Sequence, residues 1–175
     1  PALNELLAEM LKKGCSYVFM EVSSHAVVQH RIVGLQFLGG IFTNITHDHL
    51  DFHKTFDNYI KAKKGFFDLL PKSAFALVNI DDRRGNIMVQ NTKAQVATYS
   101  LQTMATFRAR IVDDSLAGMT LAIQQHEVWF KLIGRFNAYN LLAAYGAAVL
   151  AGEAEEDVLT VLSGISSPSG RFEQV

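Results

Sequence analysis

The sequence predicts an α/β domain, with a mostly parallel sheet, helices on both faces and a small antiparallel β subdomain. Short apolar runs alternate with amphipathic helical stretches over residues 4–100, which is the pattern of strand–helix–strand units. Three closely spaced β-type runs then follow between residues 106 and 133, separated only by turn residues. Hydrophobic residues make up 49% of the 175 residues and charged residues 19%, so the chain can bury its own core and is not a disordered segment.

The first half of the chain supplies the first elements of the parallel sheet. Residues 4–13 carry four apolar side chains on one helical face and predict a helix. Residues 17–22 and 37–44 are short apolar runs bounded by polar residues, as expected of strands buried on both faces. Residues 55–70 have apolar side chains at helical spacing and predict a helix.

The second half completes the sheet and adds the subdomain. We expect these elements, in chain order: strand 74–80, helix 82–91, strand 95–100, antiparallel strands 106–112, 119–124 and 127–133, helices 137–150 and 154–162, and a loop over 163–170. The alternation in the first part favours right-handed parallel connections, and the short turns in the second favour a meander.

Charge and cysteine content exclude several classes of protein. Sixteen basic and seventeen acidic residues give a net charge of −1, which argues against a general nucleic-acid binder. The single cysteine, Cys15, excludes disulfides and cysteine-rich zinc sites. No apolar run approaches the ~18–20 residues that a membrane helix needs, and no secretory signal opens the chain. We therefore expect a cytoplasmic monomer without a nucleic-acid or membrane partner.

Polar side chains gather where the first two predicted strands end. Residues 43–53 hold three of the six histidines beside two aspartates, and Glu21 ends the preceding strand together with residues 23–25. Ligands of open α/β sheets bind at the carboxyl ends of the strands, so we expect both polar ends to meet one ligand. A carboxylate with oxygen-rich neighbours suits Mg²⁺ or Mn²⁺, whereas histidines alone would suit zinc.

The zinc alternative has a specific pattern behind it. His47, His49, Asp51 and His53 are similar to the H-x-H-x-D-H run of the metallo-β-lactamase-like hydrolases. The last histidine is displaced by one residue, which would turn it away from a shared metal. A metal-dependent hydrolase therefore stays open as an alternative at this point.

The helix predicted over residues 55–70 carries three lysines that differ in direction. Each helix residue turns about 100° from the one before, so a single face presents only one of them squarely. Lys63 falls within the apolar stripe, while Lys61 and Lys64 flank it. We expect Lys63 to be semi-buried and directed at the protein body, and the other two to remain ordinary ammonium groups.

A polar turn after the first predicted strand contains another side chain that could donate hydrogen bonds to a ligand. Arg31 lies there with Gln29, before the apolar pattern resumes. An arginine with hydroxyl or amide groups near a strand end suits a phosphate or a carboxylate. A solvated loop arginine is the alternative that spacing alone leaves open.

Five segments in one order resemble the Mur ligases that add the third residue of the peptidoglycan stem peptide. The family signatures are EVSSH-x-L-x-Q-x-R, FTNLT-x-DHLDYH, Y-x-x-AK, G-x-FN-x-x-N and GRFE. The matching segments are residues 20–31 (MEVSSHAVVQHR), 42–53 (FTNITHDHLDFH), 59–63 (YIKAK), 134–140 (GRFNAYN) and 170–173 (GRFE). The first is highly specific, and all five fall in the family's order, spread over nearly the whole chain.

The resemblance implies an ATP-dependent acid–amino-acid ligase of cell-wall precursor synthesis. Such enzymes add the third amino acid to UDP-N-acetylmuramoyl-L-alanyl-D-glutamate through an acyl phosphate formed from ATP. The implied roles are Mg²⁺ binding by Glu21, His49 and a carbamylated Lys63, contacts to the UDP-linked substrate by Ser23, Gln29 and Arg31, and contacts to ATP by Asn137, Asn140 and Arg171. His47 stands where the family often has arginine, so no role is assigned to it.

The chain also departs from the family pattern. It has no G-x-x-x-x-G-K-[ST] phosphate loop, and the uridine-binding and amino-acid-selecting domains of the family have no counterpart in it. We therefore expect residues 1–175 to be the central ATP-binding domain, truncated at both ends and inactive by itself. The choice between meso-diaminopimelate and lysine stays open. So do another Mur or folylpolyglutamate-type ligase and a non-catalytic binding module.

Overall fold

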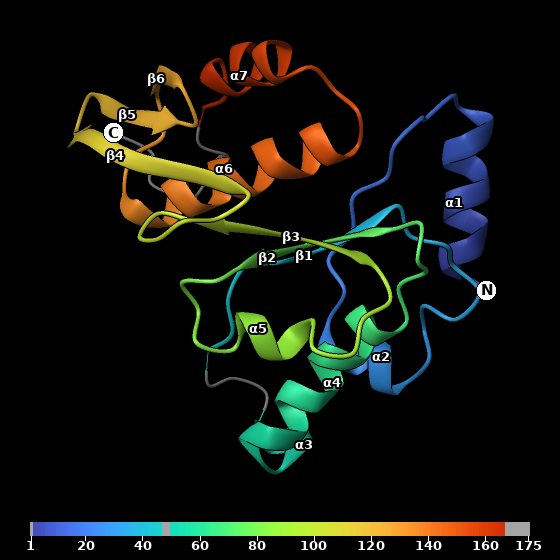
Figure 1. The fold of residues 1–175 in the computed structure, drawn as a ribbon. Coiled ribbons are helices and arrows are strands. Elements are labelled where there is room, and N and C mark those ends of the chain that lie inside the picture. The colour runs from blue at the N-terminus through green and yellow to red at the C-terminus, as the bar shows by residue number, and fades with distance from the viewer. Residues whose placement is uncertain (1, 47–49, 167–175) are drawn as a thin grey trace.

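The computed structural model describes residues 2–46 and 50–166 and contains one six-stranded sheet in the order β1-β2-β3-β4-β5-β6 (Figure 1). The strands are β1 Gly39–Phe42, β2 Phe75–Asn79, β3 Gln95–Ser100, β4 Phe107–Ser115, β5 Gly118–Ile123 and β6 His126–Phe130. The helices are α1 Ala2–Lys12, α2 Ser24–Val28, α3 Leu50–His53, α4 Phe56–Asp68, α5 Gly85–Met88, α6 Arg135–Leu150 and α7 Glu155–Ser163.

The sheet changes direction halfway across. β1, β2, β3 and β4 pair in parallel, although β3 and β4 share only the short register Tyr99↔Phe107 and Ser100↔Arg108. β4, β5 and β6 form the expected antiparallel meander, with an irregularity between Ile111 and Asp113. The predicted fold class is confirmed, and the antiparallel strands continue the same sheet.

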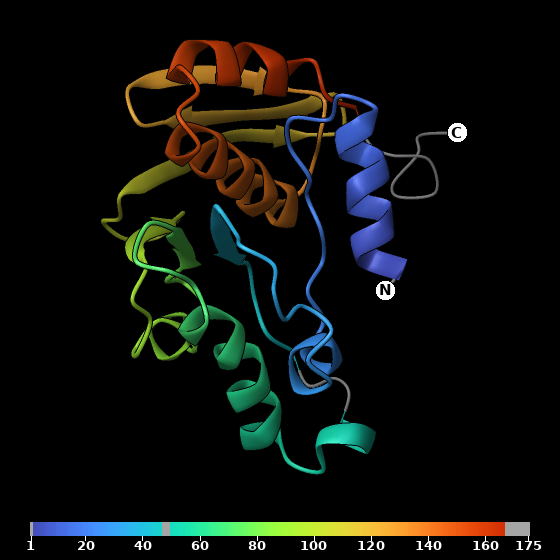
Figure 2. The same cartoon turned by 90° about the vertical axis from the view of Figure 1, so that its right-hand side faces the viewer.

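Helices cover both faces of the sheet (Figures 1 and 2). On one side, α6 and α7 pack with the meander around fully buried side chains such as Leu142 and Tyr145. On the other side, α4 and α5 pack on β1 and β2 around Phe42, Phe67 and Met88. Helix α6 is apolar nearly all round, as a helix between a sheet and a second helix must be.

The strand predicted over residues 17–22 is wrong. This segment is not part of the sheet, and its apolar side chains other than Val22 are exposed, with Phe19 83% accessible. Among the described residues β1 pairs only with β2, so its other edge is open and no ladder joins it to residues 17–22. A strand with this apolar pattern would be buried on both faces, and residues 17–22 are not buried in this way.

Three helices also differ from the prediction. The helix expected over residues 82–91 is only the single turn α5, Gly85–Met88. The short helices α2 and α3 were not predicted, because four or five residues are too few to show helical periodicity. Both flank the candidate site.

Candidate functional site

A cavity of about 590 Å³ lies between the extended segment 18–22 and strand β1. Glu21 lines it from the segment, Thr43 and Asn44 from the end of β1, and Lys63 from helix α4. Two of the three residues expected to bind a metal therefore line one cavity. The third, His49, lies outside the described residues, as does His47.

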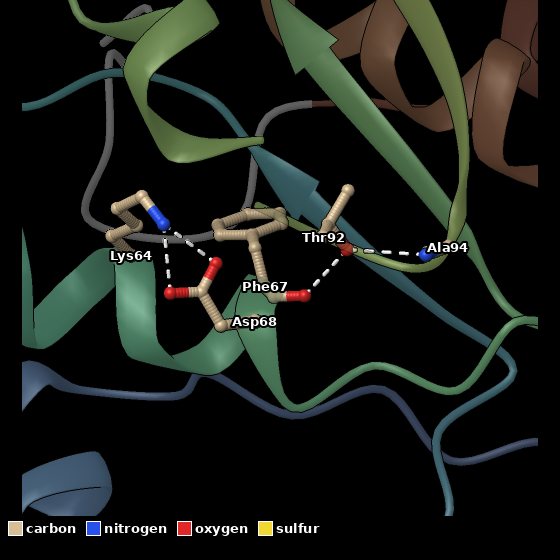
Figure 3. Close-up of polar contacts among 5 residues, drawn as sticks. All are labelled: Lys64, Phe67, Asp68, Thr92 and Ala94. Carbon is tan, nitrogen blue, oxygen red and sulfur yellow. Dashed lines mark hydrogen bonds and ion pairs between the residues drawn. The ribbon is translucent and has the colours of Figure 1, made fainter. Parts of the chain in front are cut away.

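The three lysines of α4 have different surroundings. Lys63 is half-buried, and its Nζ lies 5.4 Å from the centre of the Tyr59 ring. Lys61 is exposed. Lys64 donates to both carboxylate oxygens of Asp68 at 2.7 Å, an ion pair one turn along the helix (Figure 3). Of the three, Lys63 is the one that lines the cavity.

Helix α4 is fixed at its far end by the segment that leads into β3. Thr92 donates its hydroxyl to the carbonyl oxygen of Phe67 at 2.6 Å and accepts from the amide of Ala94 at 3.2 Å (Figure 3). At its start, the Thr55 hydroxyl caps the helix by accepting from the Asn58 amide. With both ends held, α4 presents Lys63 to the cavity in a defined position.

Helices α2 and α3 meet beside the same cavity. The Ser23 hydroxyl caps α2 by accepting from the Ala26 amide at 3.2 Å. The next residue, Ser24, is 1% exposed, and its Oγ lies 2.8 Å from Nε2 of His53, which is 6% exposed. The His53 ring also packs 5.3 Å from the Tyr59 ring. This buried hydrogen bond ties α2, which follows Glu21, to α3, and the ring contact of His53 with Tyr59 joins α3 to α4, the helix that carries Lys63.

A second cavity of about 450 Å³ lies at the carboxyl ends of β1 and β2. Its lining includes Thr43 and Asn44, Asp81 and Asp82 after β2, and the first turns of α6, with Asn140. Thr43 and Asn44 therefore line both cavities. This is the sheet edge at which open α/β folds bind ligands.

Asp81 joins three elements around the second cavity. Its carboxylate accepts from the Ser100 hydroxyl at 2.6 Å, the Leu101 amide at 2.8 Å and the Tyr139 hydroxyl at 2.9 Å. These donors belong to the end of β3, the loop after it and helix α6. Asp81 thereby holds the first turns of α6 against the sheet.

The segment after β1 is fixed in the same way. Asp82 accepts from the Ile45 amide at 3.0 Å, and the Asn79 side chain donates to the Thr43 carbonyl at 2.8 Å. The Tyr99 hydroxyl donates to the Phe42 carbonyl at 3.3 Å. Burial raises the pKa of Tyr99, so the phenol stays protonated as this hydrogen bond requires.

The remaining residues of the sequence prediction lie in several places. Gln29 and Arg31 are exposed and are not part of the lining of either cavity. Asn137 donates to the Ile133 carbonyl at 2.8 Å, and its Oδ1 accepts from Asn140 at 3.4 Å. Arg171 lies outside the described residues.

Sequence reasoning missed Asn79, Asp81 and Asp82. All three stand at the end of β2 or directly after it. The rule that pointed to Glu21 and to residues 43–53, polar side chains at the carboxyl end of a parallel strand, applies equally to them.

Comparison with known proteins decides the family. A family model described as "Mur ligase middle domain" matches residues 1–148. The chain belongs to the Mur ligase family. That assignment excludes the metallo-β-lactamase-like alternative for the histidine cluster.

Two curated relatives bear the name UDP-N-acetylmuramoyl-L-alanyl-D-glutamate--2,6-diaminopimelate ligase. The protein from Cytophaga hutchinsonii is 59% identical and that from Bacteroides thetaiotaomicron 55% identical, over 99% of this chain and 36% of each relative. A solved structure of a ligase of the same name has a TM-score of 0.88 at 30% identity, over 97% of this chain and 37% of that one. The chain thus spans about a third of the length of these Mur ligases.

Proposed function

We propose that the polypeptide containing this chain is an ATP-dependent ligase that joins meso-diaminopimelate to UDP-N-acetylmuramoyl-L-alanyl-D-glutamate. Residues 1–175 are its central ATP-binding domain. The names of the relatives support this substrate pair, and favour 2,6-diaminopimelate over lysine. The observation that carries the proposal is the pair of adjacent cavities that share Thr43 and Asn44 at the carboxyl end of β1.

The first cavity suits a magnesium ion. Glu21 offers a carboxylate there, and Lys63 faces the same space. An ammonium group repels a cation, but a carbamate formed from Lys63 and carbon dioxide would supply negative oxygen, the donor that Mg²⁺ prefers. His49 completes the proposed set. When bound, the ion neutralises charge on the phosphate groups.

The second cavity suits the nucleotide. Asn137 and Asn140, which are linked to each other, lie in the first turns of α6, and Arg171 is the remaining proposed contact to ATP. Ser23 caps the start of α2, Gln29 stands at its end and Arg31 follows it, and these three are the proposed contacts to the UDP-linked substrate. The two substrates then meet beside Thr43 and Asn44, which line both cavities.

The reaction has two steps. A carboxylate oxygen of the substrate forms a bond to the γ-phosphorus of ATP, while the bond from that phosphorus to the β–γ bridging oxygen breaks and its electron pair leaves with ADP. The amine of diaminopimelate then forms a bond to the acyl carbon. Phosphate leaves with the electron pair of the carbon–oxygen bond, and the amine releases a proton to solvent. The residues of both cavities position the reactants and neutralise charge.

The proposed reaction also implies the cellular compartment of the enzyme. No helix in the described part of the chain is long and apolar enough to cross a membrane. ATP and UDP-linked precursors are cytoplasmic metabolites, so we propose a cytoplasmic enzyme. We also propose that it acts as a monomer, as expected from the sequence.

The test uses the full-length polypeptide, because residues 1–175 contain no glycine-rich phosphate loop. Purified enzyme is incubated with Mg²⁺, ATP, the UDP-linked dipeptide and either meso-diaminopimelate or L-lysine. We expect stoichiometric ADP, phosphate and UDP-linked tripeptide with meso-diaminopimelate, and much less with lysine. Phosphate release without tripeptide, or preference for lysine, would contradict the proposal.

A further inference from the structure

The wall between the two cavities is a short segment that follows β1. Thr43 and Asn44 line the cavity of Glu21 and Lys63 and also the cavity of Asn140. These two residues therefore border both the space proposed for the metal ion and the space proposed for the nucleotide. Both side chains are exposed, so they are accessible from the cavities.

The backbone of this wall is held on three sides. The carbonyl of Phe42 accepts from Tyr99, the carbonyl of Thr43 accepts from Asn79, and the amide of Ile45 donates to Asp82. These partners come from β2, β3 and the turn after β2. A backbone held in this way fixes the starting point of a side chain before any ligand arrives.

Asn44 is the residue of this segment whose side chain can bind a ligand. Its side chain makes no hydrogen bond to any residue that the structure describes, although its neighbours on both sides are held. An asparagine amide carries two N–H donors, which suit phosphate oxygens. Phe42 packs against Phe67 of α4, and alternate residues of an extended chain share a face. Asn44 lines the same cavity as Lys63 of α4.

We propose that Asn44 is a catalytic residue that donates a hydrogen bond to the phosphoryl group during its transfer from ATP to the substrate carboxylate. The inference rests on the proposed function. As the oxygen–phosphorus bond to the carboxylate forms and the bond to ADP breaks, negative charge lies on the three oxygens of the moving group. A hydrogen-bond donor placed beside that charge stabilises the transition state more strongly than it stabilises the bound substrates.

The experiment compares variants of the full-length ligase with Asn86→Ala as a matched control, because Asn86 is an exposed asparagine on α5 outside both cavities. We expect Asn44→Ala to lower kcat about 10²–10³-fold, with both KM values within a few-fold of wild type. Asn44→Asp has the same shape but no donor and an added charge, so it should lose at least as much. Asn86→Ala should keep wild-type kinetics.

A second readout separates the chemical step from later steps. With ATP labelled with ¹⁸O at the β–γ bridge, and no diaminopimelate present, reversible phosphoryl transfer scrambles the label. Asn44→Ala should slow this exchange as much as it lowers kcat, with an unchanged melting temperature and unchanged ADP binding. Normal exchange, a rise in KM for ATP alone, or near-normal activity of Asn44→Asp would overturn the inference. A wild-type enzyme that forms no tripeptide would instead refute the proposed function, and the role of Asn44 with it.

Discussion

Replacing Asp81 by alanine should destabilise the domain, because this carboxylate accepts three hydrogen bonds from three separate elements. Ser100 is 0% exposed, so its hydroxyl loses its acceptor without gaining water. The loss costs about 1–3 kcal/mol for a buried donor of this kind. The Leu101 amide and the Tyr139 hydroxyl are half-buried and can be rehydrated, so they add less. We expect a total of about 2–4 kcal/mol in the free energy of unfolding.

The assay is urea unfolding of residues 1–175, followed by far-ultraviolet circular dichroism. Asp113→Ala is the control, because Asp113 is an exposed aspartate of β4, and its replacement should change stability by less than about 0.5 kcal/mol. Asp81→Asn keeps one carbonyl acceptor and should fall between wild type and Asp81→Ala. A loss below about 1 kcal/mol for Asp81→Ala would show that the three hydrogen bonds do not hold the sheet to α6.

Three further predictions concern other parts of the structure. His53→Ala should lower the unfolding free energy by about 1–3 kcal/mol, and a double-mutant cycle with Ser24→Ala should show coupling; additive losses would contradict the buried hydrogen bond. Gly85→Ala should cost about 1–3 kcal/mol in urea unfolding, because a Cβ there would meet the Asn79 carbonyl oxygen at 2.2 Å; wild-type stability would contradict the close approach. Burial, with the hydrogen bond to Glu155, raises the pKa of Tyr145 above the ordinary value of about 10, so above that pH the unfolded state releases the phenolic proton while the folded state keeps it. The unfolding free energy should therefore fall as pH rises from 9 to 11, by up to about 1.4 kcal/mol per pH unit, and less steeply in Tyr145→Phe; an equal slope in both proteins would contradict this.

The sequence predicted most of the fold because most elements are long enough to show their period. The helix over residues 55–70 and the strand over 95–100 were both placed within two residues of α4 and β3. The strand over 17–22 failed because an apolar run does not specify backbone pairing: among the described residues no ladder joins this segment to the open edge of β1.

The candidate site was only partly predictable. Lys63 followed from its angular position on a helix, and Glu21 from the end of an apolar run, so local patterns sufficed for both. The contact of Ser24 with His53 joins residues 29 positions apart, and that of Asp81 with Tyr139 joins residues 58 apart. No local period encodes such pairs, so they became visible only in the folded chain.

The central claim is that Glu21 and Lys63 form one metal-binding cavity in an ATP-dependent ligase, with Lys63 acting as a carbamate. The most direct measurement is the tripeptide-forming rate of full-length Lys63→Ala, with and without a short-chain carboxylic acid in the buffer. We expect most activity to be lost and part of it to return with the added carboxylate, which fills the space of the carbamate. Lys61→Ala, the control on the exposed face of α4, should stay near wild type. Full activity of Lys63→Ala, or loss of activity in Lys61→Ala alone, would contradict the account.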